Sequence, residues 1–254
     1  MKHFFCTEGE AALAELLRRQ PLLAFDFDGT LAPIVARPED ARVAPAVSRR
    51  LARLAERWPV AVVTGRQLAD VRERLGFAPG CIVGNHGAES LADPAAAERL
   101  ARALDGARAL LGAHEAALAA AGVTLEDKGQ SLALHYRLAR DRDRARAEID
   151  ALLARLGPEL KVFGGKLVCN LMAATAPDKA GAVQALVTAA GAGGALFAGD
   201  DVNDEPVFAA APPHWLTLKV GRDDPASRAR FLLDSPAEMP MLLDRILALA
   251  DAAG

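Results

Sequence analysis

An apolar run that ends in two carboxylates constrains the fold of this chain most strongly. Residues 22–25 are Leu-Leu-Ala-Phe, and Asp26-Phe27-Asp28-Gly29-Thr30 follows directly. A short, continuously apolar run bounded by polar residues is typical of a buried strand in a parallel sheet. Because ligands of such sheets bind beyond the carboxyl ends of the strands, we expect Asp26 and Asp28 at the mouth of a site. Gly29 permits a sharp turn, so the two carboxylates can approach a ligand from different sides.

A second apolar run also ends in acidic residues. Residues 195–198 lead into Gly199-Asp200-Asp201-Val202-Asn203-Asp204. For one acidic strand end alone, a helix N-cap or a solvated loop is the simpler interpretation. Two such clusters, far apart in the sequence, instead favour a site for a hard divalent cation. Mg²⁺ takes oxygen ligands in octahedral geometry and usually keeps waters and a substrate phosphate among them.

The composition excludes several classes of protein. At 254 residues and 52% hydrophobic, the chain suits one large domain or a core with a modest insert. A net charge of only −3 gives no indication of a nucleic acid or membrane partner. Three widely spaced cysteines without a CxxC motif favour a reducing compartment, and the N-terminus lacks the apolar segment of a signal peptide. We expect a soluble, cytoplasmic protein that is a monomer or a small homo-oligomer.

Strands and helices alternate in the first and last parts of the chain. Apolar periodicity predicts helices over 8–19, 45–57 and 67–75, and short apolar runs predict strands over 60–63 and 81–83. After Lys179 the pattern resumes with a helix, the strand before Gly199, a strand over 215–220 and a helix over 237–250. Such alternation implies a parallel sheet with right-handed crossovers.

The middle of the chain follows a different pattern. We expect a long helix over 95–121, a hairpin of strands over 123–128 and 131–137, a helix over 141–156, and a second hairpin of strands over 161–163 and 166–171. Gly129-Gln130 and Gly164-Gly165 are the predicted turns. The predicted class is therefore α/β, with a Rossmann-like parallel core over 1–105 and 175–254 and an inserted α+β cap over 106–174 that sets substrate specificity.

Four motifs, in this order, resemble those of the haloacid-dehalogenase-like phosphohydrolases. They are Asp26 to Thr30 after a strand, Thr64 after the strand over 60–63, Lys179, and the acidic cluster from Gly199 to Asp204. The resemblance covers most of the chain. It implies a Rossmann-like core, a Mg²⁺ cofactor and an aspartyl-phosphate intermediate.

This resemblance assigns a role to each acidic residue. Asp26 is the expected nucleophile, because a carboxylate can attack phosphorus and divide one slow hydrolysis into two easier steps. Asp28 is the expected general acid–base, and Thr64 and Lys179 complete the phosphate cradle. The resemblance implies that the ion is bound by Asp26, the backbone carbonyl of Asp28 and Asp200. Asp201 and Asp204 would support the ion or its waters, and either could exchange roles with Asp200.

Further motifs are similar to those of the trehalose-6-phosphate phosphatases. They are Val63-Thr64-Gly65-Arg66, Gly84-Asn85-His86-Gly87-Ala88-Glu89, Glu126-x-Lys128, 131–137 and Gly165-Lys166-Leu167-Val168. The resemblance implies that the sugar phosphate is contacted by Arg66, His86, Glu126, Lys128, Arg137 and Lys166. One departure affects specificity: Asn170 stands where the family typically has Glu, so a hydroxyl can be bound there without negative charge.

The expected partner is a small sugar phosphate, with trehalose 6-phosphate first. Because of Asn170, hydrolysis of sucrose phosphate or of a glycosyl-3-phosphoglycerate is an alternative function. A phosphosugar mutase of the same fold would re-donate the phosphoryl group, so release of free phosphate distinguishes the two. A non-catalytic domain that binds a sugar phosphate is a further alternative, but such domains usually lose a nucleophile or a metal ligand, and both are present here.

Overall fold

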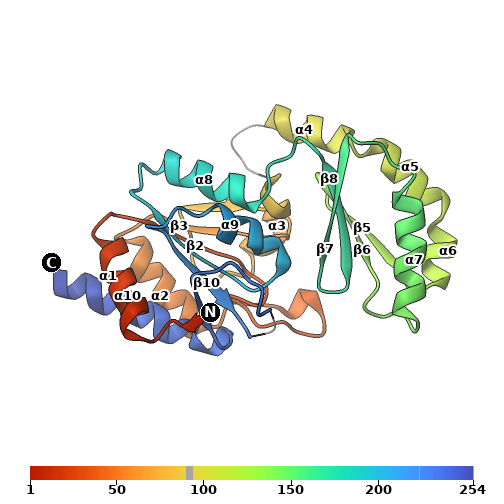
Figure 1. The fold of residues 1–254 in the computed structure, drawn as a ribbon. Helices are drawn as coiled ribbons and strands as arrows, with labels where there is room; N and C mark the ends of the chain where they lie inside the picture. The colour runs from red at the N-terminus through yellow and green to blue at the C-terminus, as the bar shows by residue number, and fades with distance from the viewer. Residues whose placement is uncertain (90–93, 223, 254) are drawn as a thin grey trace. The chain divides into compact units, whose positions relative to one another are not determined.

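The computed structural model describes residues 1–89, 94–222 and 224–253 of the chain. It consists of two compact units, Met1–Gly87 with Asp178–Gly254, and Ala88–Pro177 (Figure 1). The predicted class, a parallel α/β core with a separate α+β part, is confirmed. The second unit begins earlier than the predicted residue 106, because helix α4 (Pro94–Arg102) packs Leu100 against the cluster that contains Met172.

The first unit is built on a seven-stranded parallel sheet of order β1-β11-β10-β9-β2-β3-β4. The strands are β1 (Lys2–His3), β2 (Leu22–Phe25), β3 (Val60–Val63), β4 (Cys81–Val83), β9 (Ala195–Gly199), β10 (Leu216–Val220) and β11 (Phe231–Leu233). From β2 the chain proceeds outward through β3 and β4, and after the second unit it returns to β9 on the other side of β2. The strand order therefore reverses between β2 and β9, the place where open α/β sheets bind ligands.

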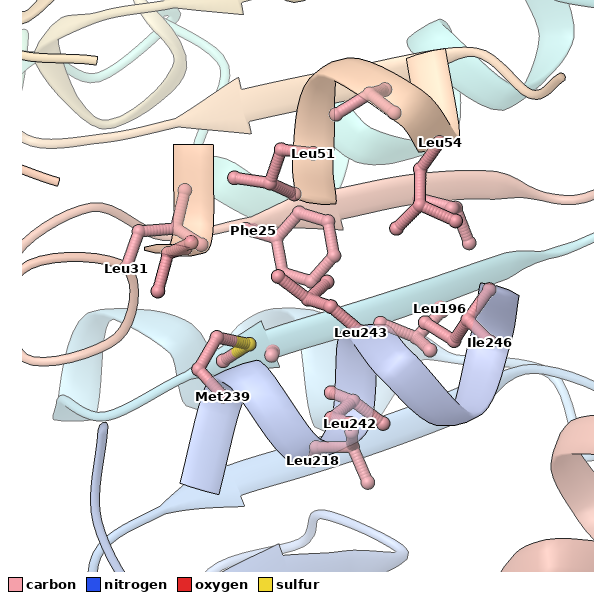
Figure 2. Packing of buried hydrophobic residues seen from close by; sticks show 14 of the residues in the cluster. Phe25, Leu31, Leu51, Leu54, Leu196, Leu218, Met239, Leu242, Leu243 and Ile246 are labelled. Atoms are coloured by element: carbon pink, nitrogen blue, oxygen red, sulfur yellow. The ribbon is translucent and has the colours of Figure 1, made fainter. Parts of the chain in front are cut away.

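Helices cover both faces of this sheet. Helices α1 (Thr7–Leu17), α2 (Pro45–Ala55) and α10 (Met239–Ala253) pack on one face, and α8 (Lys179–Ala189) and α9 (Glu205–Ala210) on the other. Figure 2 shows Phe25 of β2 against Leu51 of α2 and Leu243 of α10. The neighbouring residue Ala24 faces the opposite side, in a cluster with Val183 of α8. Burial on both faces explains why the strand is continuously apolar.

Short elements complete the first unit. Helix α3 (Leu68–Arg72) ends earlier than the predicted residue 75. The 3₁₀ turns are η1 (Pro38–Asp40), η2 (Asn85–Gly87), η3 (Val202–Asp204) and η4 (Pro236–Glu238). Among the described residues, no helix combines the length and the apolar character needed to cross a membrane.

The second unit is an antiparallel sheet of order β5-β6-β8-β7, with helices packed on one of its faces. Its strands are β5 (Thr124–Asp127), β6 (Ser131–His135), β7 (Leu160–Gly165) and β8 (Val168–Ala173), and its helices on this face are α5 (Asp105–Ala113), α6 (Glu115–Ala120) and α7 (Arg142–Leu153). Leu132, Leu134 and Leu171 point from the strands into this helical layer. The sheet matches the two predicted hairpins.

The predicted single helix over 95–121 is wrong, because the chain forms α4, α5 and α6 there. His114 leaves helical geometry, at φ −112° and ψ 11°, where α5 ends and α6 begins. A straight helix over this range would be about 40 Å long and would extend far past a five-residue strand. Leu104, Leu111 and Leu118 all lie in one hydrophobic cluster with the strands.

The predicted turn of the second hairpin is also displaced. Gly165 pairs with Val168, so the turn consists of Lys166 and Leu167, and Leu167 has φ +61°. The two adjacent glycines instead belong to strand β7. The register between β7 and β8 determines where the turn lies, since this register places Leu171 of β8 on the face that the helices bury.

Candidate active site

Three neighbouring strands end in the residues that the motifs single out. Asp26 follows β2, Thr64 follows β3 and Asp200 follows β9, and all three side chains are buried. Because β9, β2 and β3 are adjacent and parallel, their carboxyl ends meet at one edge of the sheet. The backbone N–H of Asp26 donates to the carbonyl of Ala198 at 2.9 Å, which ties the two acidic strand ends together.

Lys179 lies at the centre of the acidic cluster. Its Nζ donates to Oδ1 of Asp26 and to Oδ1 of Asp204, both at 2.7 Å, and the lysine is only 3% exposed. Asp178 caps the helix by accepting the N–H of Gly181 at 2.8 Å, so α8 begins at Lys179. One carboxylate oxygen from each of Asp26, Asp200 and Asp204 lies within 4.8 Å of the others.

Burial and mutual repulsion govern the charges of this cluster. Burial raises the pKa of the Asp26 carboxyl well above its usual range, and the carboxylates of Asp204 and Asp200 raise it further against the opposing effect of Lys179. Burial alone would lower the pKa of Lys179, but Asp204 and Asp26 raise it above its ordinary value. The lysine therefore stays protonated, and its single positive charge faces three carboxyl groups.

The donor set fits a hard divalent cation. Three buried carboxyl groups can supply the oxygen ligands that Mg²⁺ prefers, and a bound cation would offset the repulsion between their ionised forms. Asp201 lies beside this set: its backbone N–H donates to Oδ2 of Asp204 at 2.9 Å, and its Oδ2 accepts from Nδ2 of Asn203 at 3.1 Å. These bonds suit Asp201 to shaping the loop rather than to ligation.

Lys219 is a buried cation next to the acidic cluster that the motif analysis missed. It pairs with Gly199 in the β9–β10 register, is 2% exposed, and its Nζ donates to the backbone carbonyl of Asp200. A charged residue inside the apolar strand 216–220 was the available signal, since lysine is rarely buried without a partner.

Two glycines let the acidic loops approach each other closely. Gly29 has φ +77°, and a Cβ there would lie 2.1 Å from Oδ2 of Asp200. A Cβ at Gly199 would lie 2.3 Å from Cγ of Asp204. The carboxylates of the cluster thus pack directly onto glycine backbone.

Gly29→Ala is expected to disrupt the site, and Gly129→Ala provides its matched control. Gly129 has the same φ of +77°, and no described atom beyond its chain neighbours lies within 4 Å of its added Cβ. Both variants incur about 1–2 kcal/mol of left-handed strain, but only Gly29→Ala displaces Asp200. Phosphate release, the activity that the family resemblance implies, is expected to fall about 10²-fold in Gly29→Ala and to stay near wild type in the control. Equal activities in the two variants would show that Asp200 does not need this close approach.

Asp28 forms a separate group with Arg66. The guanidinium donates from Nε to Oδ2 of Asp28 at 2.7 Å and from Nη2 to Oδ1 at 2.8 Å. The Asp26 side chain is 6% exposed, whereas the Asp28 side chain is 41% exposed. The turn at Gly29 has thus sent the two carboxylates of the motif in different directions.

Thr64 and His86 lie beside this pair. Oγ1 of Thr64 accepts the backbone N–H of Arg66 at 3.2 Å, which leaves its hydroxyl proton available for donation. His86 has φ +56°, and its ring packs over Gly65, where a Cβ would lie 2.3 Å from the ring. Its backbone N–H donates to the carbonyl of Thr64 at 2.9 Å, so the two loops are joined.

In the second unit, the predicted sugar-contact residues lie on one sheet face and at one end of that sheet. Cross-strand pairing aligns Glu126, Ala133, Asn170 and Phe163 in a row on the face opposite the α5–α7 layer. Oε2 of Glu126 lies 2.8 Å from Nε2 of His135 and 3.6 Å from Nζ of Lys128. The hydrogen bond from His135, together with the charge of Lys128, lowers the pKa of Glu126 against the effect of burial.

The remaining three residues occupy different environments. Arg137 and Lys166 are exposed in adjacent loops, joined where the N–H of Tyr136 donates to the carbonyl of Leu167 at 3.1 Å. Asn170 is only 3% exposed, and its Nδ2 has no hydrogen-bond partner in the part of the chain that the structure describes. An amide donor in that state is suited to an acceptor oxygen of a ligand.

Comparison with known proteins identifies relatives for most of the chain. The model of the trehalose-phosphatase family matches residues 24–227. A curated trehalose-phosphate phosphatase of Mycobacterium bovis is 36% identical over 251 residues, covering 91% of this chain and 62% of the relative. The chain thus spans less than two thirds of the length of that relative.

Solved structures share the fold. The C-terminal domain of the Candida albicans trehalose-6-phosphate phosphatase has a TM-score of 0.75 at 20% identity, covering 95% of this chain and 96% of that one. The sucrose-phosphatase of Synechocystis, solved with sucrose and phosphate, has a TM-score of 0.61 at 19% identity, covering 91% and 98%. At these identities the likeness establishes the architecture and leaves the substrate open.

Proposed function

We propose that this chain, which belongs to the trehalose-phosphatase family, hydrolyses trehalose 6-phosphate to trehalose and phosphate. The observation that carries the proposal is the buried cluster in which Lys179 bonds both Asp26 and Asp204 beside Asp200. A nucleophilic carboxylate, a fixed cation and further oxygen ligands at the switch point of an α/β sheet suit phosphoryl transfer.

Asp26 and Asp28 would divide the reaction into two steps. In the first, an Asp26 oxygen attacks phosphorus, an O–P bond forms, the bond from phosphorus to the sugar oxygen breaks, and Asp28 gives that oxygen a proton. In the second, water attacks phosphorus of the acyl phosphate and gives a proton to Asp28. The Asp26–phosphate bond then breaks, which releases phosphate and restores Asp26 as a carboxylate and Asp28 as the protonated acid.

Lys179 and Thr64 would hold the reactants in place. Lys179 fixes one oxygen of Asp26 at 2.7 Å, which leaves the other carboxylate oxygen to meet phosphorus. The Thr64 hydroxyl, at the end of the adjacent strand, can donate its proton to a phosphoryl oxygen.

Magnesium is the cation that we propose for the cluster. Asp26, Asp200 and Asp204 would hold it, with the loop around Asp201 supporting them. When bound, the ion would screen the repulsion between the Asp26 carboxylate and the anionic phosphate and stabilise charge in the transition state.

The polar face of the second unit is the surface that we propose for the sugar. Glu126, Lys128 and His135 supply donors and acceptors, and Asn170 adds an amide donor. A site that bonds many sugar hydroxyls rejects analogues that leave its buried polar groups unpaired. Since Asn170 cannot act as a carboxylate, sucrose 6-phosphate is the specific second candidate.

A phosphate-release panel tests the proposal. We expect trehalose 6-phosphate to give a higher kcat/KM than sucrose 6-phosphate, glucose 6-phosphate and mannosyl-3-phosphoglycerate, and chelation to abolish release until Mg²⁺ is restored. Calorimetric titration of the protein with Mg²⁺ is expected to detect binding that Asp200→Asn removes. A better rate with sucrose 6-phosphate would change the substrate, whereas no release from any member would refute phosphatase activity.

A further inference from the structure

We propose that Arg66 is a positioning residue that holds the Asp28 carboxylate, rather than a ligand of the sugar phosphate. The inference rests on the proposed function, in which Asp28 is the general acid–base. It also revises the expectation from family resemblance, which placed Arg66 on the substrate.

The donors of Arg66 are already committed to the protein. Two N–H groups bind both oxygens of Asp28, Nη1 donates to Oδ2 of Asp70 at 2.7 Å, and Nη2 donates again to the carbonyl of Pro38 at 2.8 Å. These four bonds use four of the five N–H donors of a guanidinium. A bidentate grip on a phosphate needs two, so Arg66 cannot clamp one without releasing a carboxylate that it now holds.

The surroundings of Arg66 fix its orientation. Its side chain is 12% exposed, and its Cζ lies 5.1 Å from the ring centroid of Phe27, the residue between the two motif carboxylates. A planar guanidinium stacked on a ring and bound at both ends has little freedom left. The position of Asp28 is therefore set by the position of Arg66.

A second ion pair anchors this arrangement to the next helix. Asp70 of α3 accepts from Arg66 through Oδ2 and from Arg74 through Oδ1, with Arg74 Nε at 2.8 Å. Arg74 also donates to the carbonyl of Glu39, and Arg66 to that of Pro38, both in η1. The chain Asp28–Arg66–Asp70–Arg74 thus links the expected acid–base residue to α3 and to η1.

The test is the separation of kcat from KM in Arg66→Lys and Asp70→Asn. Lysine keeps the charge but cannot bind both Asp28 oxygens, and Asp70→Asn leaves Arg66 intact while it removes the anchor. On trehalose 6-phosphate, or the panel member that wild type hydrolyses best, we expect kcat to fall about 10²-fold in Arg66→Lys. We expect a fall of about tenfold in Asp70→Asn, with KM within about threefold of wild type in both.

Arg50→Lys is the matched control. Arg50 also binds both oxygens of one carboxylate: its Nε and Nη2 donate to Asp244 at 2.7 and 2.8 Å. This pair joins α2 to α10, away from the acidic cluster. The kcat and KM of Arg50→Lys are expected to match wild type. If Arg66→Lys instead raises KM at unchanged kcat, and Asp70→Asn is silent, Arg66 binds substrate and the proposal is wrong. Should Arg66→Lys fail to fold, as judged by circular dichroism, Asp70→Asn decides alone.

An activated ester separates positioning of the acid from binding of phosphate. p-Nitrophenolate leaves without a proton donor, and kcat/KM covers only the steps up to its departure. If Arg66 serves Asp28, kcat/KM of Arg66→Lys for p-nitrophenyl phosphate should fall at least about tenfold less than for the sugar phosphate. Equal falls for both esters would indicate lost phosphate binding and overturn the proposal. A wild type inactive on every phosphate ester would instead refute the proposed function.

Discussion

Asp26→Asn is expected to lower phosphate release by about 10⁴-fold or more while the protein stays folded. An amide oxygen at this position cannot form the acyl phosphate, and the remaining groups of the cluster do not replace a covalent nucleophile. Release from trehalose 6-phosphate measures the loss. Mass spectrometry of acid-quenched wild type, saturated with substrate, is expected to find the phosphoryl group on the peptide that contains Asp26.

The fold of Asp26→Asn should survive for an electrostatic reason. Burial, together with repulsion from Asp204 and Asp200, raises the pKa of Asp26, so a neutral amide removes an unfavourable buried charge, and Lys179 keeps its 2.7 Å bond to Asp204. Without divalent cation, the thermal midpoint is therefore expected not to fall. Asp244→Asn, the same change in an exposed ion pair, controls for the chemistry of the substitution. Residual turnover within about a hundredfold of wild type would rule out Asp26 as nucleophile.

Among the variants proposed here, Lys179→Met is expected to lower the free energy of unfolding most, by about 3–5 kcal/mol in the absence of metal. The substitution removes the cation bonded to both Asp26 and Asp204, so their carboxylates are left buried with that partner gone. Chemical denaturation followed by circular dichroism gives the free energy of unfolding. Lys2→Met is the control, because Lys2 and Glu8 form a solvent-exposed ion pair, and its loss is expected to leave the free energy of unfolding close to that of wild type.

A double variant identifies the cause of that loss. If uncompensated charge is responsible, Lys179→Met combined with Asp204→Asn should be more stable than Lys179→Met alone, because one orphaned carboxylate has been neutralised. Added Mg²⁺ should likewise recover part of the stability of Lys179→Met. A double variant that is less stable than Lys179→Met would indicate that lost packing, and not charge, dominates.

The central strands could be predicted from the sequence because their local signal is strong. Strands β2 and β3 have the predicted bounds, since a strand buried on both faces reads as a continuous apolar run that stops at the first polar residue; the edge strand β4 also has its predicted bounds. The breaks between α4, α5 and α6 could not be predicted, because the alanine-rich segment favours helix throughout. The break at His114, with φ −112° and ψ 11°, leaves no signal in a segment where helix-forming residues continue on both sides.

The candidate site was predictable where a motif carries it. Asp26, Asp200 and Lys179 were named from strand ends and motif order, and the structure brings all three together. The pairing of Arg66 with Asp28 depends on the path of the segment around Pro38, which no local pattern reports. The sequence does mark Lys219 as unusual, because it is a charged residue within an apolar strand. Only the order of the strands in the sheet places it next to Asp200.

The pairing of β2 with β9 determines when the reactive centre can exist. These neighbours are separated in the sequence by β3, β4 and the whole second unit, and Asp26 and Asp200 follow their ends. Such long-range closure is the slow kind of event in chain assembly. In a nascent chain from which β9 has not yet been synthesised, the acidic cluster therefore still lacks Asp200 and Asp204. The carboxyl groups of Asp26 and Asp200 come together only when β2 has paired with β9.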